Sequence, residues 1–360
     1  MKLNKLEAIR GFAAVYVVLH HTFSKGLLIG GRDFSVFFRF GQEAVILFFL
    51  LSGFVIYYAY AQSRDKSVKT FLSKRFLRIY IPLLFVFITN YALVCLSAGA
   101  RAPIDWWTLG GNLLMLQDSS FLKPGVICGP FLGNQPLWSL SYEWWFYMLF
   151  IGITVAAQKR AAAPRRSLLV YAMGTCAALT YLVYPNFLNR ELMYLVIWWA
   201  GADMARLYIA GQAITLRSMR TPLLVLLVNV GILSINVMLH NHHATPGMSP
   251  FLELRHFAFA LVTIVLAIAW KKLNWVGFRQ TLGLFEPLAP ISFGLYISHW
   301  FLIATAHYLD GLVGGQLLRF ACYTVVCLCF SYLVERVLYV RLNRWIVTRL
   351  PKKTGLIVPA

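Results

Sequence analysis

Charged residues are scarce in this sequence, and acidic residues are the scarcest of them. Only 13% of the 360 residues are charged, with 13 Asp and Glu against 33 Lys and Arg. Soluble domains carry about a quarter charged residues, so this chain has too little polar sequence to cover a water-facing surface. The composition excludes a soluble globular enzyme and a disordered protein. The hydrophobic share of 59% indicates a polytopic membrane protein instead.

Cysteine is also rare and shows no functional spacing. The six cysteines form no CxxC pair, and no His/Cys spacing typical of a metal site occurs. We therefore expect no disulfide scaffold, no metal site and no bound cofactor. The basic N-terminus is similar to the start of a signal peptide, but Arg10 interrupts the apolar run that follows. We expect a retained first span.

Ten apolar segments predict an all-α, polytopic membrane helix bundle of about ten transmembrane helices. A helix needs about 17 or more apolar residues to cross the bilayer core, and lipid leaves helices as the default because it cannot satisfy exposed backbone groups. The segments run near 6–24, 40–62, 79–99, 137–158, 167–185, 191–210, 222–240, 256–271, 287–309 and 315–340.

The basic residues predict the orientation of these spans. With the N-terminus placed inside, 25 of the 33 Lys and Arg fall on the inner side, as the positive-inside rule requires. Both termini are then cytoplasmic, and residues 341–360 form a basic cytoplasmic tail. The same rule explains the net charge of +20, so we expect no nucleic-acid partner. Residues 100–136 and 241–255 form long outer loops, which are either binding loops or re-entrant segments.

The first apolar segment contains ionisable side chains. Arg10 and His21 are 11 positions apart, which places them about 20° apart around a helix and about 16 Å apart along it. His20 points elsewhere. An ionisable group inside a span is costly unless it faces protein or water, so each is a functional candidate. The alternative is structural, with Arg10 as an interfacial anchor and His21 as a core histidine.

Two arginines precede the third span. Arg75 and Arg78 lie three positions apart and so share one face of a helix. At the inner membrane surface such a pair can bind phosphate groups, although ordinary positive-inside charge explains most basic residues of this chain.

Polar stripes mark two further segments. The stripes are Ser139, Glu143 and Tyr147 in the fourth segment, and Ser292, Tyr296 and His299 in the ninth. One such stripe suits packing between helices. Several stripes that each carry a titratable group favour a shared polar cavity.

Five motifs in this order resemble those of the membrane-bound acyltransferase 3 family, from residue 6 to about residue 340. They are Arg10 with His21, FFLLSGF at 48–54, KRFLRIYIP at 74–82, WSLSYE at 138–143 and ISFGLYISHW at 291–300. Members are polytopic enzymes that transfer acyl groups, usually acetyl from acetyl-CoA, to hydroxyls of surface or secreted glycans. The resemblance implies that residues 1–340 form the acyltransferase domain.

The resemblance also implies the roles of individual residues. Arg10 and His21 match the essential Arg/His pair, and Glu143 matches the acidic residue after the Trp-Ser-Leu run. Arg75 and Arg78 match the basic motif, which is expected to bind the phosphates of cytosolic acyl-CoA. His21 is the candidate general base for the acceptor hydroxyl, although its own acylation is the open alternative. Further candidates around the reacting groups are Ser139, Ser292, Tyr296 and His299.

The sequence departs from the family pattern at two places. Members often have an acidic residue where this chain has Ile46, with Glu43 one turn earlier as a candidate replacement. Polar residues often follow the acidic residue of the fourth segment, whereas Trp144 and Trp145 follow Glu143 here.

Two other functions fit parts of the pattern. A secondary transporter would also carry intramembrane Arg, His and Glu, but transporters usually have repeated halves, and spans 1–5 do not resemble spans 6–10. A membrane glycosyltransferase would usually show an acidic motif in an outer loop, where residues 100–136 carry only Asp105 and Asp118. The expected partners are acyl-CoA as co-substrate, the lipid bilayer of a bacterial inner membrane, polysaccharide-assembly proteins and a glycan acceptor. Exopolysaccharide, lipopolysaccharide, peptidoglycan and a small glycoside all remain open as acceptors.

Overall fold

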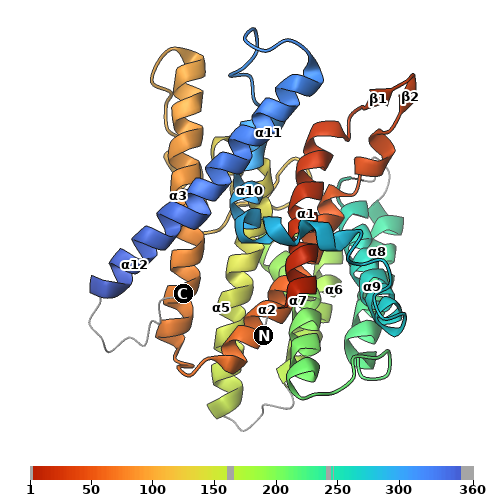
Figure 1. Ribbon diagram of the computed structural model, residues 1–360. Coiled ribbons are helices and arrows are strands. Elements are labelled where there is room, and N and C mark those ends of the chain that lie inside the picture. Colours follow the sequence, from red (N-terminus) through yellow and green to blue (C-terminus); the bar gives the residue numbers. More distant parts are fainter. Residues whose placement is uncertain (1–2, 160–165, 241–244, 246, 350–360) are drawn as a thin grey trace.

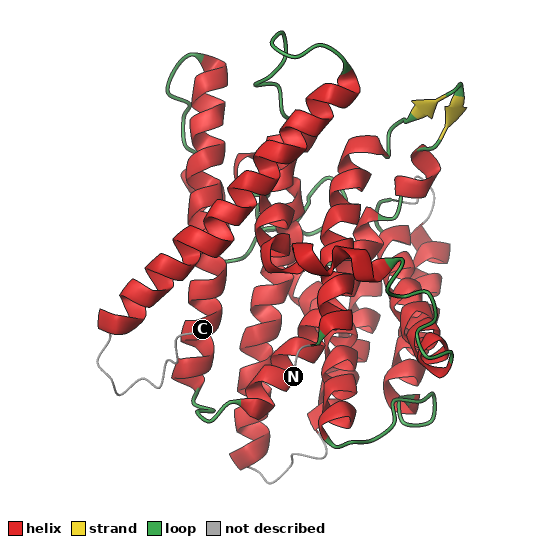
Figure 2. Ribbon diagram, viewed as in Figure 1, coloured by secondary structure: helices red, strands yellow, loops and turns green. Residues whose placement is uncertain are grey.

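The chain folds as a bundle of long helices. The computed structural model describes residues 3–159, 166–240, 245 and 247–349. In this part of the chain, β-structure is confined to one antiparallel hairpin, β1 (Leu28–Ile29) and β2 (Arg32–Asp33), and one isolated bridge. Figures 1 and 2 show the helices packed side by side with short connections at their ends. The prediction of an all-α polytopic bundle is confirmed.

The helices follow the predicted apolar segments closely. The first eight long helices are α1 (Asn4–Phe23), α2 (Gly41–Gln62), α3 (Val68–Ala98), α5 (Trp138–Lys159), α6 (Arg166–Val183), α7 (Phe187–Ile209), α8 (Arg220–His240) and α9 (Phe251–Lys272). A composite helix follows, made of η5 (Leu282–Ile291), α10 (Ser292–His299) and η6 (Trp300–Ala304). The last helix joins α11 (Gln316–Tyr332), η7 (Leu333–Leu338) and α12 (Tyr339–Arg349). Short helices are η1 (Ser35–Phe38), α4 (Trp106–Leu113), η2 (Phe131–Gly133) and η3 (Gln135–Leu137).

Eight helical segments of the described chain are long and apolar enough to cross a membrane, so the chain is a multi-pass membrane protein. The predicted first and sixth spans, α1 and α7, are not among the eight, although they contain 20 and 23 residues. Both helices carry charged residues, which lower their mean hydropathy. α7 is buried over most of its length and packs against α2 and α6.

Glycines allow the central helices to touch. A Cβ atom on Gly53 of α2 would lie 1.8 Å from the carbonyl oxygen of Trp198 in α7, and one on Gly201 of α7 would lie 2.0 Å from that of Leu50 in α2. Only glycine permits this reciprocal contact, as at other close crossings of membrane helices. The Ser-Gly pair at residues 52–53 therefore has a packing role.

The first helix and the late part of the chain pack directly on each other. η5 crosses α1 in Figure 1, and a Cβ on Gly11 of α1 would lie 2.1 Å from the carbonyl oxygen of Phe285 in η5. α10 continues from η5 and also packs against α1. Residues near positions 10 and 290 thereby line the same space.

The third helix begins earlier than the sequence predicts. The apolar run predicts a start at residue 79, but α3 starts at Val68. The hydroxyl of Ser67 accepts a hydrogen bond from the amide of Thr70 at 3.3 Å, and Asp65 accepts one from the amide of Ser67 at 2.8 Å. These contacts cap the orphan amides of a helix start. Arg75 and Arg78 consequently lie within α3 rather than in a loop before it.

The segment between α3 and α5 is partly built into the bundle. Trp106 and Trp107 of α4 are more than 70% exposed, but Met115, Gln117 and Asp118 are at most 1% exposed. The predicted loop 100–136 is thus partly buried against the helices, while Phe121 stays 75% exposed; its role as a binding loop or as a re-entrant segment stays a prediction. In the other predicted loop, 241–255, residues 241–244 and 246 lie outside the described residues.

The two ends of the described chain lie toward the same end of the bundle. In Figure 1, α1 begins and α12 ends in the lower half of the view, where the connections α2–α3 and α7–α8 also lie. The helix continues to Arg349, so the predicted start of the tail at residue 341 falls within α12. Residues 350–360 lie outside the described residues.

Candidate active site

A cavity of about 150 Å³ lies between α1, α2, α3, α5 and the η5–α10 segment. Members of both polar stripes that the sequence predicts converge here, together with Arg10 and the pair Arg75 and Arg78. Seven of the nine predicted site residues line the cavity: Arg10, Arg75, Arg78, Ser139, Glu143, Ser292 and Tyr296. The other two, His21 and His299, are absent from its lining and lie beyond Tyr296.

Two of the three arginines in the cavity are paired with carboxylates. Arg10 donates a hydrogen bond to Glu7 one turn away at 2.9 Å and another to the carbonyl oxygen of Ala289 in η5 at 3.2 Å. Arg78 forms an ion pair with Glu335 of η7, which is only 4% exposed. These contacts tie α1 to η5 and α3 to the last helix, around the rim of the cavity.

Arg75 differs from both. Within the described residues no carboxylate lies within ion-pairing distance of its guanidinium, and its Nε is buried without a hydrogen-bond partner. The guanidinium lies 5.8 Å from the ring centre of Phe71 and 5.9 Å from that of Tyr147. A buried cation without a paired anion is costly. Arg75 is therefore the side chain best placed to bind an anionic ligand.

Glu143 is held by hydroxyl groups. The hydroxyl of Ser52 donates to Glu143 at 3.0 Å, and the hydroxyl of Tyr147 also donates to it. The indole of Trp198 in α7 donates in turn to Ser52 at 3.1 Å. Glu143 thus presents a fixed carboxylate to the cavity from α5, and Ser52 links that carboxylate to the crossing of α2 with α7.

Tyr296 of α10 lines the cavity and forms hydrogen bonds with the chain around the start of α5. The hydroxyl groups of Tyr296 and Ser139 share a hydrogen bond of 2.7 Å, and Tyr296 also donates to the carbonyl oxygen of Pro136 at 2.8 Å. Ser292, one turn before Tyr296, donates to the carbonyl oxygen of Ala289 at 2.8 Å. Ser292 therefore caps the backbone at the start of α10, while Tyr296 and Ser139 separate the cavity from the connection between η2 and α5.

His21 lies behind this tyrosine and contacts His299. The two rings are joined by a contact of 3.0 Å between Nδ1 of His21 and Nε2 of His299, and Trp300 packs edge-on against His21. The ring of His299 lies 6.0 Å from that of Tyr296. Arg10 and His21 both face the η5–α10–η6 segment, as the helical spacing predicts.

His20 points about 100° away around α1, toward η1 and α2, although its ring centre lies 4.9 Å from that of His21. Its Nδ1 lies 2.6 Å from the carbonyl oxygen of Phe38, and its ring packs against Gly41 at the start of α2. Glu43, the candidate replacement for an acidic residue at position 46, pairs with Arg255 of α9.

Three residues of this site have no functional role predicted from the sequence. Ser52 is interpretable from the sequence as a packing residue only, and its contact with Glu143 joins residues 91 positions apart. Tyr147 is visible as the third member of the polar stripe on α5, but its bond to Glu143 is not. Glu335, the partner of Arg78, carries a detectable signal: it is an isolated acid inside an apolar segment.

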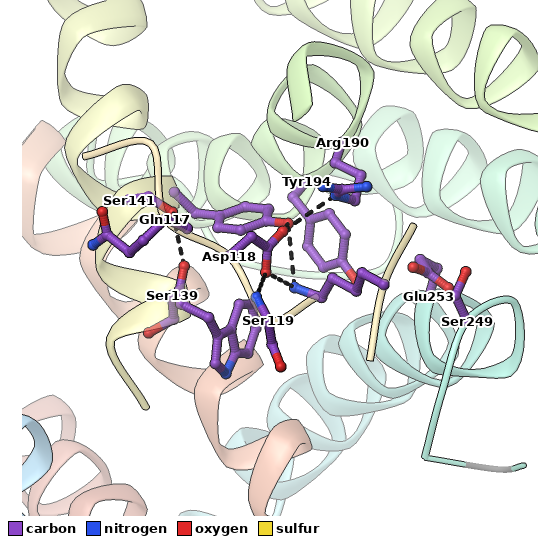
Figure 3. Close-up of polar contacts among 12 residues, drawn as sticks. Gln117, Asp118, Ser119, Ser139, Ser141, Arg190, Tyr194, Ser249 and Glu253 are labelled. Atoms are coloured by element: carbon purple, nitrogen blue, oxygen red, sulfur yellow. Dashed lines mark hydrogen bonds and ion pairs between the residues drawn. The ribbon is translucent and has the colours of Figure 1, made fainter. Parts of the chain in front are cut away.

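A second polar cluster, the loop ion cluster, consists of Asp118, Lys123 and Arg190. All three side chains are fully buried; Lys123 lies 2.9 Å and Arg190 lies 3.2 Å from the carboxylate of Asp118. Figure 3 shows Asp118 and Arg190 facing each other, with Glu253 of α9 nearby. Burial by itself raises the pKa of Asp118, but the adjacent Lys123 and Arg190 hold that pKa below its ordinary value.

The loop ion cluster attaches the connection before α5 to α7, and a nearby hydrogen bond attaches it to the residues before α9. Arg190 also donates to the carbonyl oxygens of Pro124 and Gly125, and the amide of Ser249 donates to the carbonyl oxygen of Leu122 at 2.9 Å. The ammonium of Lys123 lies 3.6 Å from the ring centre of Trp138, next to Ser139. The cluster therefore fixes the start of α5, on which Ser139 and Glu143 stand.

The cavity offers a cation for an anionic group and a fixed carboxylate, and His299 lies outside it, next to Tyr296. Within the described residues, no group of three or more His, Cys, Asp or Glu is placed to hold a metal ion. The cavity is smaller than the roughly 300–1,000 Å³ of typical ligand pockets, so it suits a narrow part of a ligand.

Comparison with known proteins adds an independent observation. The chain matches the family model described as "Acyltransferase domain" over residues 3–336. It is also 35% identical over 156 residues to Acyltransferase MdmB of Streptomyces mycarofaciens. That similarity covers 42% of this chain and 38% of the relative, so it spans less than half of either protein. No solved structure matches the chain.

Proposed function

Because the chain belongs to the family defined by this acyltransferase domain, we propose that it is a membrane O-acyltransferase. It moves an acyl group, acetyl as the expected case, from cytosolic acyl-CoA to a hydroxyl of an extracytoplasmic glycan. The observation that carries the proposal is the cavity in which Arg10, Arg75, Arg78 and Glu143 converge. These are residues that the resemblance to the family singles out.

The donor enters from the side of Arg75 and Arg78. Coenzyme A carries several phosphates, and a guanidinium without a paired anion binds phosphate through charge-assisted hydrogen bonds. Arg75 is the phosphate contact, with Arg10 and Arg78 at the rim. The small volume of the cavity suits the pantetheine arm and the thioester, while the nucleotide stays outside.

His21 acts as the general base. Sugar hydroxyls are weak nucleophiles, and a histidine removes their proton efficiently near neutral pH. As the hydroxyl oxygen attacks the thioester carbon, Nε2 of His21 takes the proton. The tetrahedral intermediate then collapses, the C–S bond breaks, and the CoA thiolate leaves and takes the proton from His21. Glu143 stabilises the positively charged groups of the cavity during this sequence.

The basic residues support the sidedness of this reaction. The split of 25 to 8 Lys and Arg favours both termini in the cytoplasm and places the donor side there. A bacterial inner membrane, with an exopolysaccharide or lipopolysaccharide as acceptor, fits this arrangement. The secondary transporter is the competing function, and the experiment below separates the two.

The test compares His21→Ala with His20→Ala, a matched control from the same turn of α1. Membranes that contain each variant receive radiolabelled acetyl-CoA, and labelled glycan is measured per unit of inserted protein. We expect His21→Ala to lower transfer by about 10²–10⁴-fold, the usual effect of losing a general base, with acetyl-CoA binding kept. His20→Ala keeps most of the activity because its ring faces η1 and α2.

Two results would contradict the proposal. Activity of His21→Ala would show that His21 is not the general base. Equal inactivity of His20→Ala and His21→Ala would show that the two histidines, on different faces of α1, do not differ in function. Uptake of substrate without acetyl-CoA, and with no labelled product, would identify a transporter. Mass spectrometry of surface glycans from cells with and without the gene then identifies the acceptor by a lost acetyl increment.

A further inference from the structure

We propose that His299 is a positioning residue that fixes the ring tautomer of His21, leaving Nε2 of His21 as the atom that accepts a proton. This inference rests on the function proposed above, in which His21 is the general base. His299 does not line the cavity, so it affects the reaction through His21 rather than by touching the substrate.

A backbone carbonyl group determines which nitrogen of His299 carries the hydrogen. Nδ1 of His299 lies 2.7 Å from the carbonyl oxygen of Tyr296, one turn earlier in α10. A carbonyl oxygen only accepts hydrogen bonds, so Nδ1 of His299 must carry the hydrogen. A neutral imidazole has one N–H group. Nε2 of neutral His299 therefore carries a lone pair and acts as an acceptor.

The same reasoning then applies to His21. Its Nδ1 lies 3.0 Å from Nε2 of His299 and 3.1 Å from the carbonyl oxygen of Val17. Both neighbours are acceptors, so Nδ1 of His21 must carry the hydrogen. The N–H group donates to both the His299 nitrogen and the Val17 oxygen. The remaining nitrogen, Nε2, keeps its lone pair and is the atom available as a base.

The protonated form of His299 fits this geometry less well. A hydrogen on Nε2 of His299 would have to be donated to Nδ1 of His21, which would then turn a lone pair toward the carbonyl oxygen of Val17. His299 is fully buried, and no carboxylate of the described residues lies within hydrogen-bond distance of either ring. Burial without a paired anion disfavours a charged imidazole.

The ring of His21 is also held in orientation. Trp300 packs edge-on against it with ring centres 5.0 Å apart, and the ring of His299 lies 5.1 Å away at an angle of 32°. The α10–η6 segment, which packs on α1, thus sets both the orientation of the His21 ring and the nitrogen that carries its hydrogen. This resembles the way in which a second residue orients a catalytic histidine in other enzymes.

Two substitutions separate this role from simple packing. His299→Phe keeps an aromatic ring but removes the acceptor for His21. His299→Gln offers an amide oxygen near the former Nε2 position and so restores an acceptor. We expect His299→Phe to lower kcat about 10- to 100-fold, the size found for residues that orient a functional histidine. The KM for acetyl-CoA should stay within about twofold, and His299→Gln should recover a large part of kcat.

The decisive measurement is nitrogen NMR of histidine-labelled protein in lipid nanodiscs. The His21 signals are identified by their loss in His21→Ala. In the wild-type protein they should report a hydrogen on Nδ1. In His299→Phe the carbonyl oxygen of Val17 is the acceptor left for Nδ1, so the signals should move part of the way toward the Nε2–H tautomer, while the His20 signals stay unchanged. His299→Gln should keep the wild-type tautomer.

A wild-type His21 with its hydrogen on Nε2 overturns the inference, and this holds even if every variant fails to fold. An unchanged tautomer and unchanged kcat in His299→Phe overturn it as well. Absence of acyl transfer by the wild-type protein would instead remove the proposed function, while the tautomer of His21 would still be measurable. The two failures are therefore distinguishable.

Discussion

Arg75 and Arg78 lie one helical turn apart, yet their surroundings give them different roles. Arg78 is neutralised by the buried Glu335 and helps to join α3 to the last helix. Arg75 has no such partner among the described residues, and its guanidinium faces the cavity. At the residue scale, the proposed binding of an anion by Arg75 rests on the lack of an ion-paired carboxylate among the described residues.

This difference leads to a prediction about donor binding. Arg75→Ala should weaken acetyl-CoA binding by about 10- to 150-fold, because a charge-assisted contact with phosphate is worth roughly 1.5–3 kcal/mol. Arg75→Lys should restore part of the affinity, since lysine offers a point charge without the planar fork. Binding of radiolabelled acetyl-CoA to nanodisc-embedded protein measures both.

Two controls keep that experiment specific. Lys74→Ala removes a charge from the same basic run without touching the cavity, and it should bind acetyl-CoA normally. Arg78→Ala should reduce the amount of folded protein, because it leaves Glu335 buried without its cation. Normal binding by Arg75→Ala would show that this arginine is only a topology charge.

At the scale of elements, the connection before α5 determines where Ser139 and Glu143 stand. The loop ion cluster attaches this connection to α7, and the hydroxyl of Tyr142 in α5 donates to Asp118 at 2.6 Å. A cluster of this kind contributes less by its own energy than by the cost of leaving a buried charge unpaired when one member is removed.

We therefore expect Lys123→Met to destabilise the protein by about 3–5 kcal/mol, the usual cost of breaking a buried ion pair. Thermal unfolding in a fixed detergent measures the change. Asp310→Asn provides the control, because it breaks an exposed pair with Arg319 and should cost at most about 1 kcal/mol. Equal effects of the two substitutions would contradict the structural role of the loop ion cluster.

At the scale of the whole molecule, the orientation of the spans across the membrane is a prediction that reporter fusions can test. The basic residues predict both termini inside, so a reporter fused after Ala360 should read as cytoplasmic, as should one inserted in the α7–α8 connection. A reporter inserted in the hairpin β1–β2 should read as external. An external reading at Ala360 would reverse the donor side and the route assigned to acyl-CoA.

The sequence predicts the helices well and their contacts poorly, for physical reasons. Hydropathy depends on local composition, so most span ends agree with the structure within about five residues. The larger differences are the capped start of α3 at Val68 and the last helix, which continues to Arg349. Helical spacing also separates His21 from His20. Contacts between distant residues leave no such pattern. His21 contacts His299, which is 278 positions away, and Asp118 in the connection before α5 pairs with Arg190 of α7.

The packing of α1 on η5 and α10 also has a consequence for the order of synthesis. α1 ends at Phe23, whereas η5 begins at Leu282. At about 5–20 residues per second, Arg10 and His21 stay without Ala289 and His299, 279 and 278 positions later, for roughly 14–56 seconds. A chain interrupted before Leu282 would already contain helices α2 to α9, yet it would lack one wall of the cavity and the partner of His21. The site is therefore completed only after α9 has been synthesised.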